Sequence, residues 1–526
     1  MSNPKDLTRR EFVTDAGKAT VGTLVAVSAP LIVPRRVLGR GRRAPSDTVN
    51  VGIVGCGGMG CQNALVLAQT ERIGAVCDVD FVYSEHQVAE TVKGAEGKAR
   101  PDGLRLQEQF RKAKHYADFR EMLTKEKGLD GVVVATPDHL HGVIAKAALE
   151  LGKHVYVQKP LTATVHEARV LGQSAREHPK LVTQMGNQGH SSEDARLINE
   201  WIQAGLIGPV HEVHVWTNRP IVFWPQGLPR PTGVMPPEVF NPFSNPWTYR
   251  HVQDLLAGAM GAGGAPPAGL EWELFLGPVN EDVPYHPVYH PFNWRGWLDF
   301  GSGALGDMGA HLLDHPFWAL GLTYPTSIEA TSTPWGTMTL PPLDPSAPVN
   351  TPAGRPQRRP VSFPVSTSVH YEFAARGADP PVKLFWSDGG IYPPRPPMLP
   401  DDVELASEGG VIFIGEKGIL LHGTYGANPR LYPQALMEQA AQVPKSIPRI
   451  PWSHELNWAK AIRGEAKASS PLEYAAQLTE VMLLGIVALR TGQGRKLLYD
   501  GERGVITNIA DANQYLTREY RAEWAI

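Results

Sequence analysis

The chain has 526 residues, of which 42% are hydrophobic and 20% charged, a composition typical of a globular protein with more than one domain. Its formal net charge is -3, and the body of the chain contains no Lys/Arg-rich run. Both features argue against nucleic acid or an anionic membrane surface as a partner. The spacing of Cys56, Cys61 and Cys77 fits neither a disulfide framework nor a zinc site, so we expect three small core residues.

Residues 1–45 are predicted to be a twin-arginine export signal and linker. Arg9 and Arg10 precede Phe12 and an uncharged, apolar run over residues 19–33. This run is shorter than the roughly 20 residues of a bilayer-spanning helix. We therefore expect an exported, periplasmic protein without a stable membrane span, unless the signal is retained as an anchor. The alternative is a chance arginine pair before a buried helix.

A dinucleotide-binding pattern follows. An apolar strand over residues 49–54 leads into G-x-G-x-x-G at residues 55–60, then a helix, and then a strand over residues 73–77 that ends in Asp78. The expected cofactor contacts are Gly55, Gly57, Gly58, Met59, Gly60 and Asp78. Asp78 would accept the ribose hydroxyls and repel a 2′-phosphate, and Asp80 would add to that repulsion, so NAD is preferred over NADP. The alternative is a glycine-rich turn without a ligand.

A second strand–helix unit begins with the apolar strand over residues 131–135, which is followed by an amphipathic helix. Because ligands of parallel sheets lie beyond the carboxyl ends of the strands, we expect Thr136, Pro137 and His141 to line the nicotinamide side of the cleft. A capping role for His141 or Asp138 is the alternative.

The next strand, residues 154–157, ends in Gln158-Lys159-Pro160. Together with the glycine motif and the preceding T-P-x-x-x-H, this pattern resembles the glucose-fructose oxidoreductase, inositol dehydrogenase and rhizopine-catabolism (Gfo/Idh/MocA) family. The resemblance implies that Lys159 is the catalytic lysine, touching both the substrate hydroxyl and the nicotinamide ribose. The family's usual triplet is Glu-Lys-Pro, so Gln158 removes a carboxylate that could pair with the lysine. Without the flanking motifs, Lys159 would be interpreted as a solvated lysine in a turn.

Far downstream, Asp307 and His311 are four residues apart on one face of a predicted helix, and we expect Asp314 and His315 near the same side. Such a pair can bind a metal, form a structural hydrogen bond, or supply an acid and a base; no further ligands are suitably spaced, so no metal is predicted. Residues 303–314 match the family motif G-x-L-x-D-x-G-x-H-x-x-D. The resemblance implies that His311 takes the hydroxyl proton while Asp307 orients it or holds a substrate hydroxyl.

A Pro- and Trp-rich insert over residues 220–291 precedes that helix. Aromatic rings beside Arg and Asn are typical of a carbohydrate site, so Trp294, Arg295 and Asn187 are predicted substrate contacts. The alternative is a proline-stiffened loop that packs its own aromatics.

The predicted fold is α/β, with a Rossmann domain over residues 46–186, an α+β domain with an open, mainly antiparallel sheet over 187–500, and a tail over 501–526. We expect hydride transfer between a sugar, polyol or glycoside hydroxyl carbon and tightly bound NAD. One alternative is redox-neutral glycoside cleavage by oxidation, elimination and re-reduction; another is a non-catalytic nucleotide- or sugar-binding protein. Family analogy implies a homodimer or homotetramer.

Overall fold

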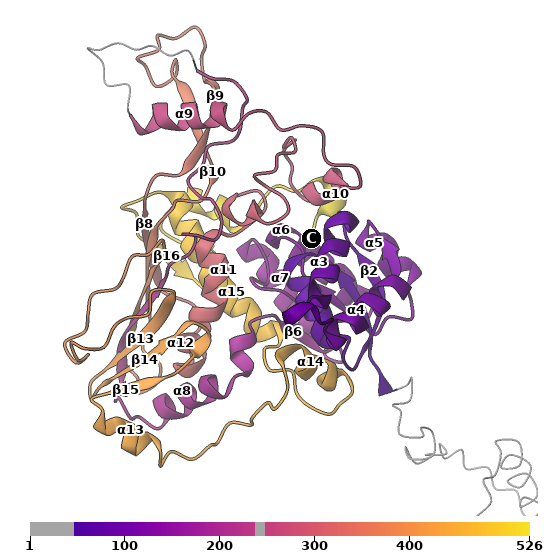
Figure 1. Cartoon of the computed structure of the whole chain (residues 1–526). Coiled ribbons are helices and arrows are strands. Elements are labelled where there is room, and N and C mark those ends of the chain that lie inside the picture. The colour runs from indigo at the N-terminus through magenta and orange to yellow at the C-terminus, as the bar shows by residue number, and fades with distance from the viewer. Residues whose placement is uncertain (1–46, 237–247) are drawn as a thin grey trace, which may run out of the picture. The chain divides into compact units, whose positions relative to one another are not determined.

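Two β-sheets, one parallel and one mainly antiparallel, organise the chain in the computed structural model, which describes residues 47–236 and 248–526 (Figure 1). Thr48–Ile526 cluster as one unit. The export signal expected over residues 1–45 lies outside the described residues and stays a prediction from sequence.

The six strands of the first sheet run parallel in the order β3-β2-β1-β4-β5-β6. Their bounds are β1 (Asn50–Val54), β2 (Arg72–Cys77), β3 (Lys114–Tyr116), β4 (Gly131–Val134), β5 (His154–Val157) and β6 (Thr183–Met185). The chain reverses its direction of winding between β1 and β4. Ligands of such sheets bind beyond the carboxyl ends of the strands at this switch point. The predicted Rossmann fold is confirmed.

Helices cover both faces of this sheet, which is why its central strands are apolar throughout. Val133 and Tyr156 pack in one core cluster, whereas their neighbours Val132 and Val134 pack in another. The helices are α2 (Gly58–Leu67), α3 (Phe81–Val92), α4 (Pro101–Lys112), α5 (Phe119–Lys125), α6 (Asp138–Glu150) and α7 (Val165–Glu177). All three cysteines are buried free thiols of these two clusters, in agreement with a core role.

The second sheet has nine strands in the order β15-β14-β13-β7-β12-β11-β8-β16-β17. Only β7 and β12 pair in parallel; the other pairs are antiparallel, which confirms the predicted open, mainly antiparallel sheet. The bounds are β7 (Val210–Thr217), β8 (Ser327–Ser332), β11 (Thr367–Phe373), β12 (Val382–Ser387), β13 (Gly409–Gly415), β14 (Ile419–Gly423), β15 (Arg430–Tyr432), β16 (Leu497–Asp500) and β17 (Val505–Ile506).

Two helices connect the sheets at the level of the predicted site. Helix α15 (Leu472–Thr491) packs against α7 of the first sheet and against α11 (Gly303–Leu312) and β8 of the second. Helix α15 is long and apolar enough to cross a membrane, but 83% of its apolar window is buried inside the protein, as in a core helix. Helix α11 carries Asp307 and His311, so its packing places them beside the first sheet. A short helix, α12 (Asp314–Ala319), follows.

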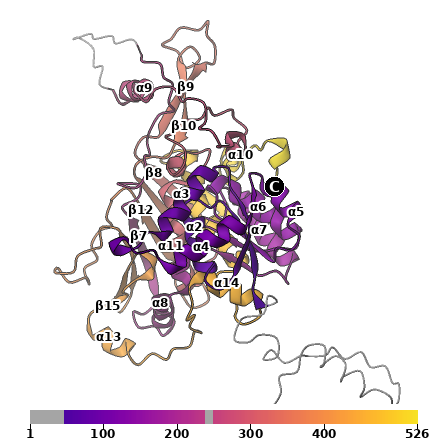
Figure 2. The same ribbon diagram turned by 45° about the vertical axis from the view of Figure 1, so that its right-hand side comes forward.

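The described residues of the insert, 220–236 and 248–291, are largely irregular but well packed. They include α9 (Tyr249–Ala259) and α10 (Trp272–Leu276), and the 3-10 helix η5 (Asn293–Gly296) follows the insert. A separate two-stranded ribbon of β9 (Gly336–Pro342) and β10 (Pro356–Ser362) lies beside it. Both views place α10 near the C-terminus of the chain (Figures 1 and 2). The aromatic residues around α10 form a core cluster of their own that includes Trp272, Phe275, Tyr289 and Trp297.

Candidate active site

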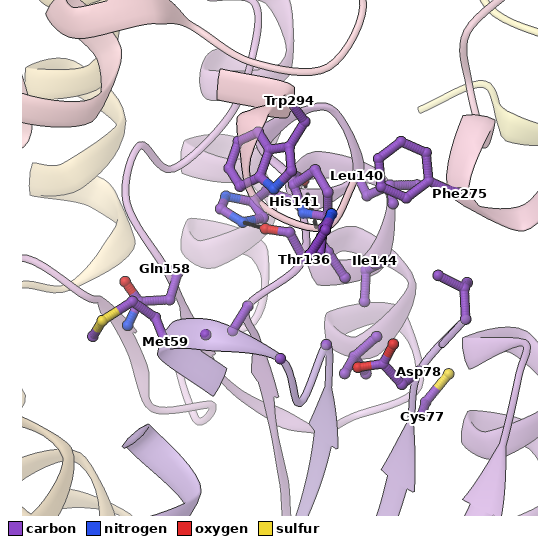
Figure 3. Close-up of a pocket in the computed structure, with 18 of the residues that line it drawn as sticks. Met59, Cys77, Asp78, Thr136, Leu140, His141, Ile144, Gln158, Phe275 and Trp294 are labelled. Carbon is purple, nitrogen blue, oxygen red and sulfur yellow. Dashed lines mark hydrogen bonds between the residues drawn. The ribbon is translucent and has the colours of Figure 1, made fainter. Parts of the chain in front are cut away.

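A cavity of about 340 Å³ lies at the carboxyl ends of the parallel strands (Figure 3). The glycine loop, the ends of β2, β4 and β5, and the insert contribute to its walls. Of the expected cofactor contacts, those lining the cavity are Gly55, Gly57, Gly58, Met59, Asp78, Thr136, Pro137, His141 and Lys159. Gly60 does not line it, and its role is in packing.

The glycine loop has the shape that a pyrophosphate requires. Gly55 has φ 81°, and a Cβ on Gly60 would lie 1.7 Å from the Gly55 carbonyl oxygen, so a side chain fits at neither position. Helix α2 starts at Gly58 with no side-chain cap from the described residues and no acidic residue in its first turn. Its free N–H groups and dipole therefore suit an anion, and the residues present fit a dinucleotide.

Asp78 follows β2 and points into the cavity (Figure 3). Its Oδ2 accepts a hydrogen bond of 2.6 Å from the Cys56 N–H, and its Oδ1 accepts one of 2.9 Å from the Asp80 N–H. Burial raises the pKa of Asp78, and these N–H donors act in the opposite direction. Asp80 does not line the cavity: its carboxylate caps α3 at Tyr83 N and accepts a 2.8 Å hydrogen bond from His290 Nε2.

His141 is buried and positions the lysine loop. Its Nδ1 lies 2.8 Å from the Pro160 carbonyl oxygen and its Nε2 lies 2.9 Å from that of Thr136, so the ring links the ends of β5 and β4. Burial lowers the pKa of His141 to about 4, which keeps the ring neutral. The alternative capping role of His141 or Asp138 is not seen: the N-cap residue of α6 is Pro137, and no side chain of the described residues caps the helix.

Lys159 and Asp307 form the ion pair at the centre of the site. Lys159 Nζ lies 2.6 Å from Asp307 Oδ1 and donates a second hydrogen bond, 3.0 Å long, to the Asp307 carbonyl oxygen. Arg295 Nε lies 3.4 Å from the same Oδ1. Burial disfavours the charged form of Asp307, but the charges of Lys159 and Arg295 outweigh it and hold its pKa well below its usual range. The carboxylate is thus ionised between two cations.

Gln158 points away from this pair. Its Nε2 donates a 2.8 Å hydrogen bond to Asn63 Oδ1, and Asn63 Nδ2 donates a 2.9 Å bond to Glu455 Oε1. From the sequence, Gln158 was expected to deprive Lys159 of a carboxylate that could pair with it. The structure corrects this, because the carboxylate that pairs with the lysine comes from α11, 148 residues away.

His311 lies one helical turn after Asp307 and is buried. Its ring contacts Tyr425 edge-on at 4.6 Å between centroids, and its Nδ1 has no hydrogen-bond partner among the residues that the structure describes. Burial and the Lys159 charge lower the pKa of His311 well below its usual value, so the ring is neutral. Asp314 is not on this side, contrary to expectation: it accepts hydrogen bonds from His190 Nδ1 at 2.9 Å and from the Tyr474 hydroxyl at 2.6 Å.

Of the predicted substrate contacts, Trp294 and Arg295 line the cavity. The Arg295 guanidinium lies 4.2 Å from the centroid of the Trp294 ring, within cation–π distance, and 4.6 Å from that of Phe292. Asn187 is fully buried and does not line the cavity, and neither atom of its amide has a partner in the described parts of the chain. Within residues 47–236 and 248–526, no cluster of His, Cys, Asp and Glu could hold a metal ion.

Several residues of this cavity were not predicted from the sequence. Asp138 is 4% exposed and lies on its wall; burial raises its pKa to about 7, while the Arg295 charge acts against this. Phe275 and His290 reach the cavity from the insert, and Trp524 reaches it from the C-terminus. The aromatic content of the insert is a weak signal for the first two. No local pattern marks Trp524.

Comparison with known proteins agrees with this geometry. The model of the oxidoreductase family with an NAD-binding Rossmann fold, Gfo/Idh/MocA, matches residues 49–185, and the model of that family's C-terminal alpha/beta domain matches residues 261–334. The chain belongs to the Gfo/Idh/MocA family. Its first matched segment carries the glycine loop and Lys159, and its second carries Asp307 and His311.

Curated relatives of this Gfo/Idh/MocA protein include an alpha-N-acetylgalactosaminidase from Shewanella oneidensis, 28% identical over 212 residues, which are 38% of this chain and 43% of that relative. A glycosyl hydrolase family 109 protein from Shewanella putrefaciens is 26% identical over 211 residues, again 38% of this chain and 43% of the relative. The match thus spans less than half the length of these relatives.

Solved structures of the same fold cover more of the chain. The WlbA dehydrogenase from Chromobacterium violaceum, in complex with NADH and UDP-GlcNAcA, has a TM-score of 0.51 at 17% identity and covers 87% of this chain and 97% of its own. Levoglucosan dehydrogenase, in complex with NADH and L-sorbose, has a TM-score of 0.50 at 16% identity and covers 86% of this chain and 99% of its own. At these identities the likeness concerns the fold.

Proposed function

We propose that the protein is an NAD-dependent oxidoreductase that transfers a hydride between bound NAD and a hydroxyl-bearing carbon of a sugar, polyol or glycoside. The observation that carries this proposal is the Lys159–Asp307 ion pair at the carboxyl edge of the sheet, whose lysine lines the same cavity as the glycine loop. Lysine, carboxylate and neutral histidine there can manage a hydroxyl proton beside a dinucleotide.

Each side chain then has a defined part. NAD, when bound, supplies the hydride acceptor. Lys159 donates a hydrogen bond to the substrate hydroxyl oxygen and stabilises negative charge that develops on it. Neutral His311 accepts the hydroxyl proton as the carbon loses its hydride and the C–O bond becomes a carbonyl. Asp307 fixes the lysine and offsets the positive charge that His311 gains, and the low exposure of the two paired side chains limits the access of water.

We further propose that the cofactor is NAD. Asp78 places a carboxylate where a ribose 2′-phosphate would be repelled, and its two oxygens are already oriented by backbone N–H groups. The nucleotide released by denaturing the purified protein should therefore be NAD, and recovery of NADP would overturn this role for Asp78.

A second candidate is redox-neutral glycoside cleavage, and the named activity of the alpha-N-acetylgalactosaminidase relative favours it. Oxidation of a ring hydroxyl makes the neighbouring C–H acidic; loss of that proton then expels the glycosidic oxygen, water adds, and the hydride returns to the sugar. Such a cycle needs no external oxidant. We also infer from sequence alone that residues 1–45 direct export out of the cytoplasm. No free nicotinamide pool exists outside the cytoplasm, so a self-contained cycle is an advantage there. Fractionation of cells that express the full chain tests that location.

The test of function is the near-ultraviolet absorbance of reduced nicotinamide in the purified protein, followed while a panel of sugars, polyols and glycosides is added without free cofactor. A lasting rise with one compound supports net oxidation. Consumption of a glycoside without a lasting rise supports redox-neutral cleavage. If protein that carries NAD gives neither response with any compound, both proposed activities are contradicted.

A further inference from the structure

The last part of the predicted C-terminal tail, residues 517–526 and called the tail from here on, returns to the Rossmann sheet after the second sheet is complete. It ends in the 3-10 helix η8 (Ala522–Trp524), and Trp524 is 4% exposed and lines the same cavity as Asp78. Both views place the end of the chain beside α6 and α10 (Figures 1 and 2). Trp524 is thus a buried tryptophan that a segment more than 400 residues after Asp78 brings to the same cavity.

Trp524 lies at the adenosine end of the cavity. Its ring centroid is 5.9 Å from that of Phe119, the first residue of α5, which lines the cavity, and the Arg120 guanidinium lies 4.4 Å from the Trp524 ring centroid. Phe119 and Asp78 follow β3 and β2, the half of a Rossmann sheet whose acidic residue contacts the adenosine ribose. Trp524 therefore offers an aromatic wall at the end where the base of a dinucleotide would lie.

Buried ionic contacts hold the tail in place. Glu167, which is fully buried on α7, accepts a hydrogen bond of 2.5 Å from Arg518 Nη2 and one of 2.9 Å from the Tyr520 hydroxyl. Arg518 Nη2 also donates to the His139 carbonyl oxygen at 2.5 Å on α6. Removing Arg518 would leave a buried carboxylate with less compensation, so this docking is costly to undo.

The tail also locks the insert across the cavity. Arg521 Nη1 lies 2.9 Å from Glu273 Oε2 on α10, and Tyr520 forms a β-bridge with Val279. The insert contacts both sides of the cavity. Beside β2, the Glu271 N–H donates to the Val79 carbonyl oxygen at 2.9 Å, and beside α6, His139 Nε2 lies 2.8 Å from the Phe275 carbonyl oxygen. Insert and tail together span the groove from the loop after β2 to α6.

We propose that the tail is part of the dinucleotide site: Trp524 covers the adenosine half, and tail and insert together hold NAD as a resident group that exchanges slowly. This rests on the proposed function, in that the cavity binds NAD. Exchange requires the tail to undock, so the release rate depends on Trp524 and on the Arg518–Glu167 contact.

The experiment measures exchange of bound NAD for NAD labelled in the adenine ring, in the full chain and without substrate. Trp524→Ala should speed exchange by about tenfold or more, because stacking of an aromatic ring on a base contributes about that factor. Trp452→Ala is the matched control: Trp452 is 37% exposed, stacks on Lys460 at 4.5 Å and does not line the cavity. It should exchange as slowly as the unaltered protein.

A second variant, Trp524→Phe, keeps an aromatic wall and should exchange at a rate between those of Trp524→Ala and the unaltered chain. Unaltered exchange in Trp524→Ala, or fast exchange in the unaltered protein itself, overturns the proposal. Because the readout is nucleotide exchange, protein that holds NAD firmly but oxidises no sugar would refute the proposed activity and leave this inference standing.

Discussion

Replacing Lys159 by alanine tests the centre of the site most directly. At 2.6 Å from Asp307 Oδ1, and with the two side chains 12% and 13% exposed, the pair has a Coulomb energy of about 6 kcal/mol at an effective dielectric constant of about 20. Desolvation offsets part of this, and Arg295 remains 3.4 Å from the same oxygen. We therefore expect the unfolding free energy to fall by about 3 kcal/mol, the lower end for breaking a buried pair.

Activity should fall much further than stability. Losing the group that contacts the hydroxyl oxygen should lower turnover by about 10² to 10³-fold, while NAD stays bound because the glycine loop and Asp78 are untouched. The assay pairs nicotinamide absorbance during turnover with nucleotide content after denaturation and with urea unfolding.

Lys153→Ala is the matched control for this variant. Among the residues that the structure describes, Lys153 Nζ donates to the carbonyl oxygens of Lys127 and Leu129, at 2.9 and 2.8 Å, and the residue does not line the cavity. It should lose stability without losing turnover per folded molecule. Undiminished turnover in Lys159→Ala would refute the assignment of Lys159, and equal loss of turnover in both variants would show that activity follows stability alone.

Three further variants test separate parts of the site. Burial raises the pKa of Asp138 from 3.8 to about 7, so the folded protein holds this proton more tightly and the unfolding free energy should decline as pH rises from about 4 to 7. Asp138→Asn should remove up to about 4 kcal/mol of that decline in urea titrations across this range. An unchanged pH profile would contradict the burial argument. Gln158→Glu should lower the unfolding free energy by about 1–3 kcal/mol because it buries a carboxylate and removes the donor to Asn63, without raising turnover; a gain in activity would show that position 158 does reach Lys159. Asp78→Ser should weaken NAD binding and narrow the preference over NADP in equilibrium titrations, and an unchanged ratio would place cofactor selection elsewhere.

The glycine loop, Asp78 and the strand ends that carry Thr136 and Lys159 were predictable from sequence, since their geometry depends on short-range backbone constraints. A tight turn with φ 81° at Gly55 and a close approach at Gly60 leave a local signature of glycines between an apolar strand and a helix. The motif around Asp307 and His311 was also recognisable in the sequence, but its proximity to Lys159 could be inferred only from the family resemblance.

Contacts between distant segments were decided by the tertiary structure alone. Asp80 looked like a second cofactor acid until packing brought His290, 210 residues away, onto its carboxylate. Gln158 was expected to leave Lys159 without a neighbouring carboxylate, yet Asp307 supplies one, and the Gln158 side chain turns toward Asn63 on α2. Trp524 carries no local pattern, because its place on the cavity depends on how Arg518 and the insert dock against α6, α7 and α10. Short-range geometry can be read along the chain, whereas the direction of a buried polar side chain depends on which partner the rest of the fold brings within hydrogen-bond distance.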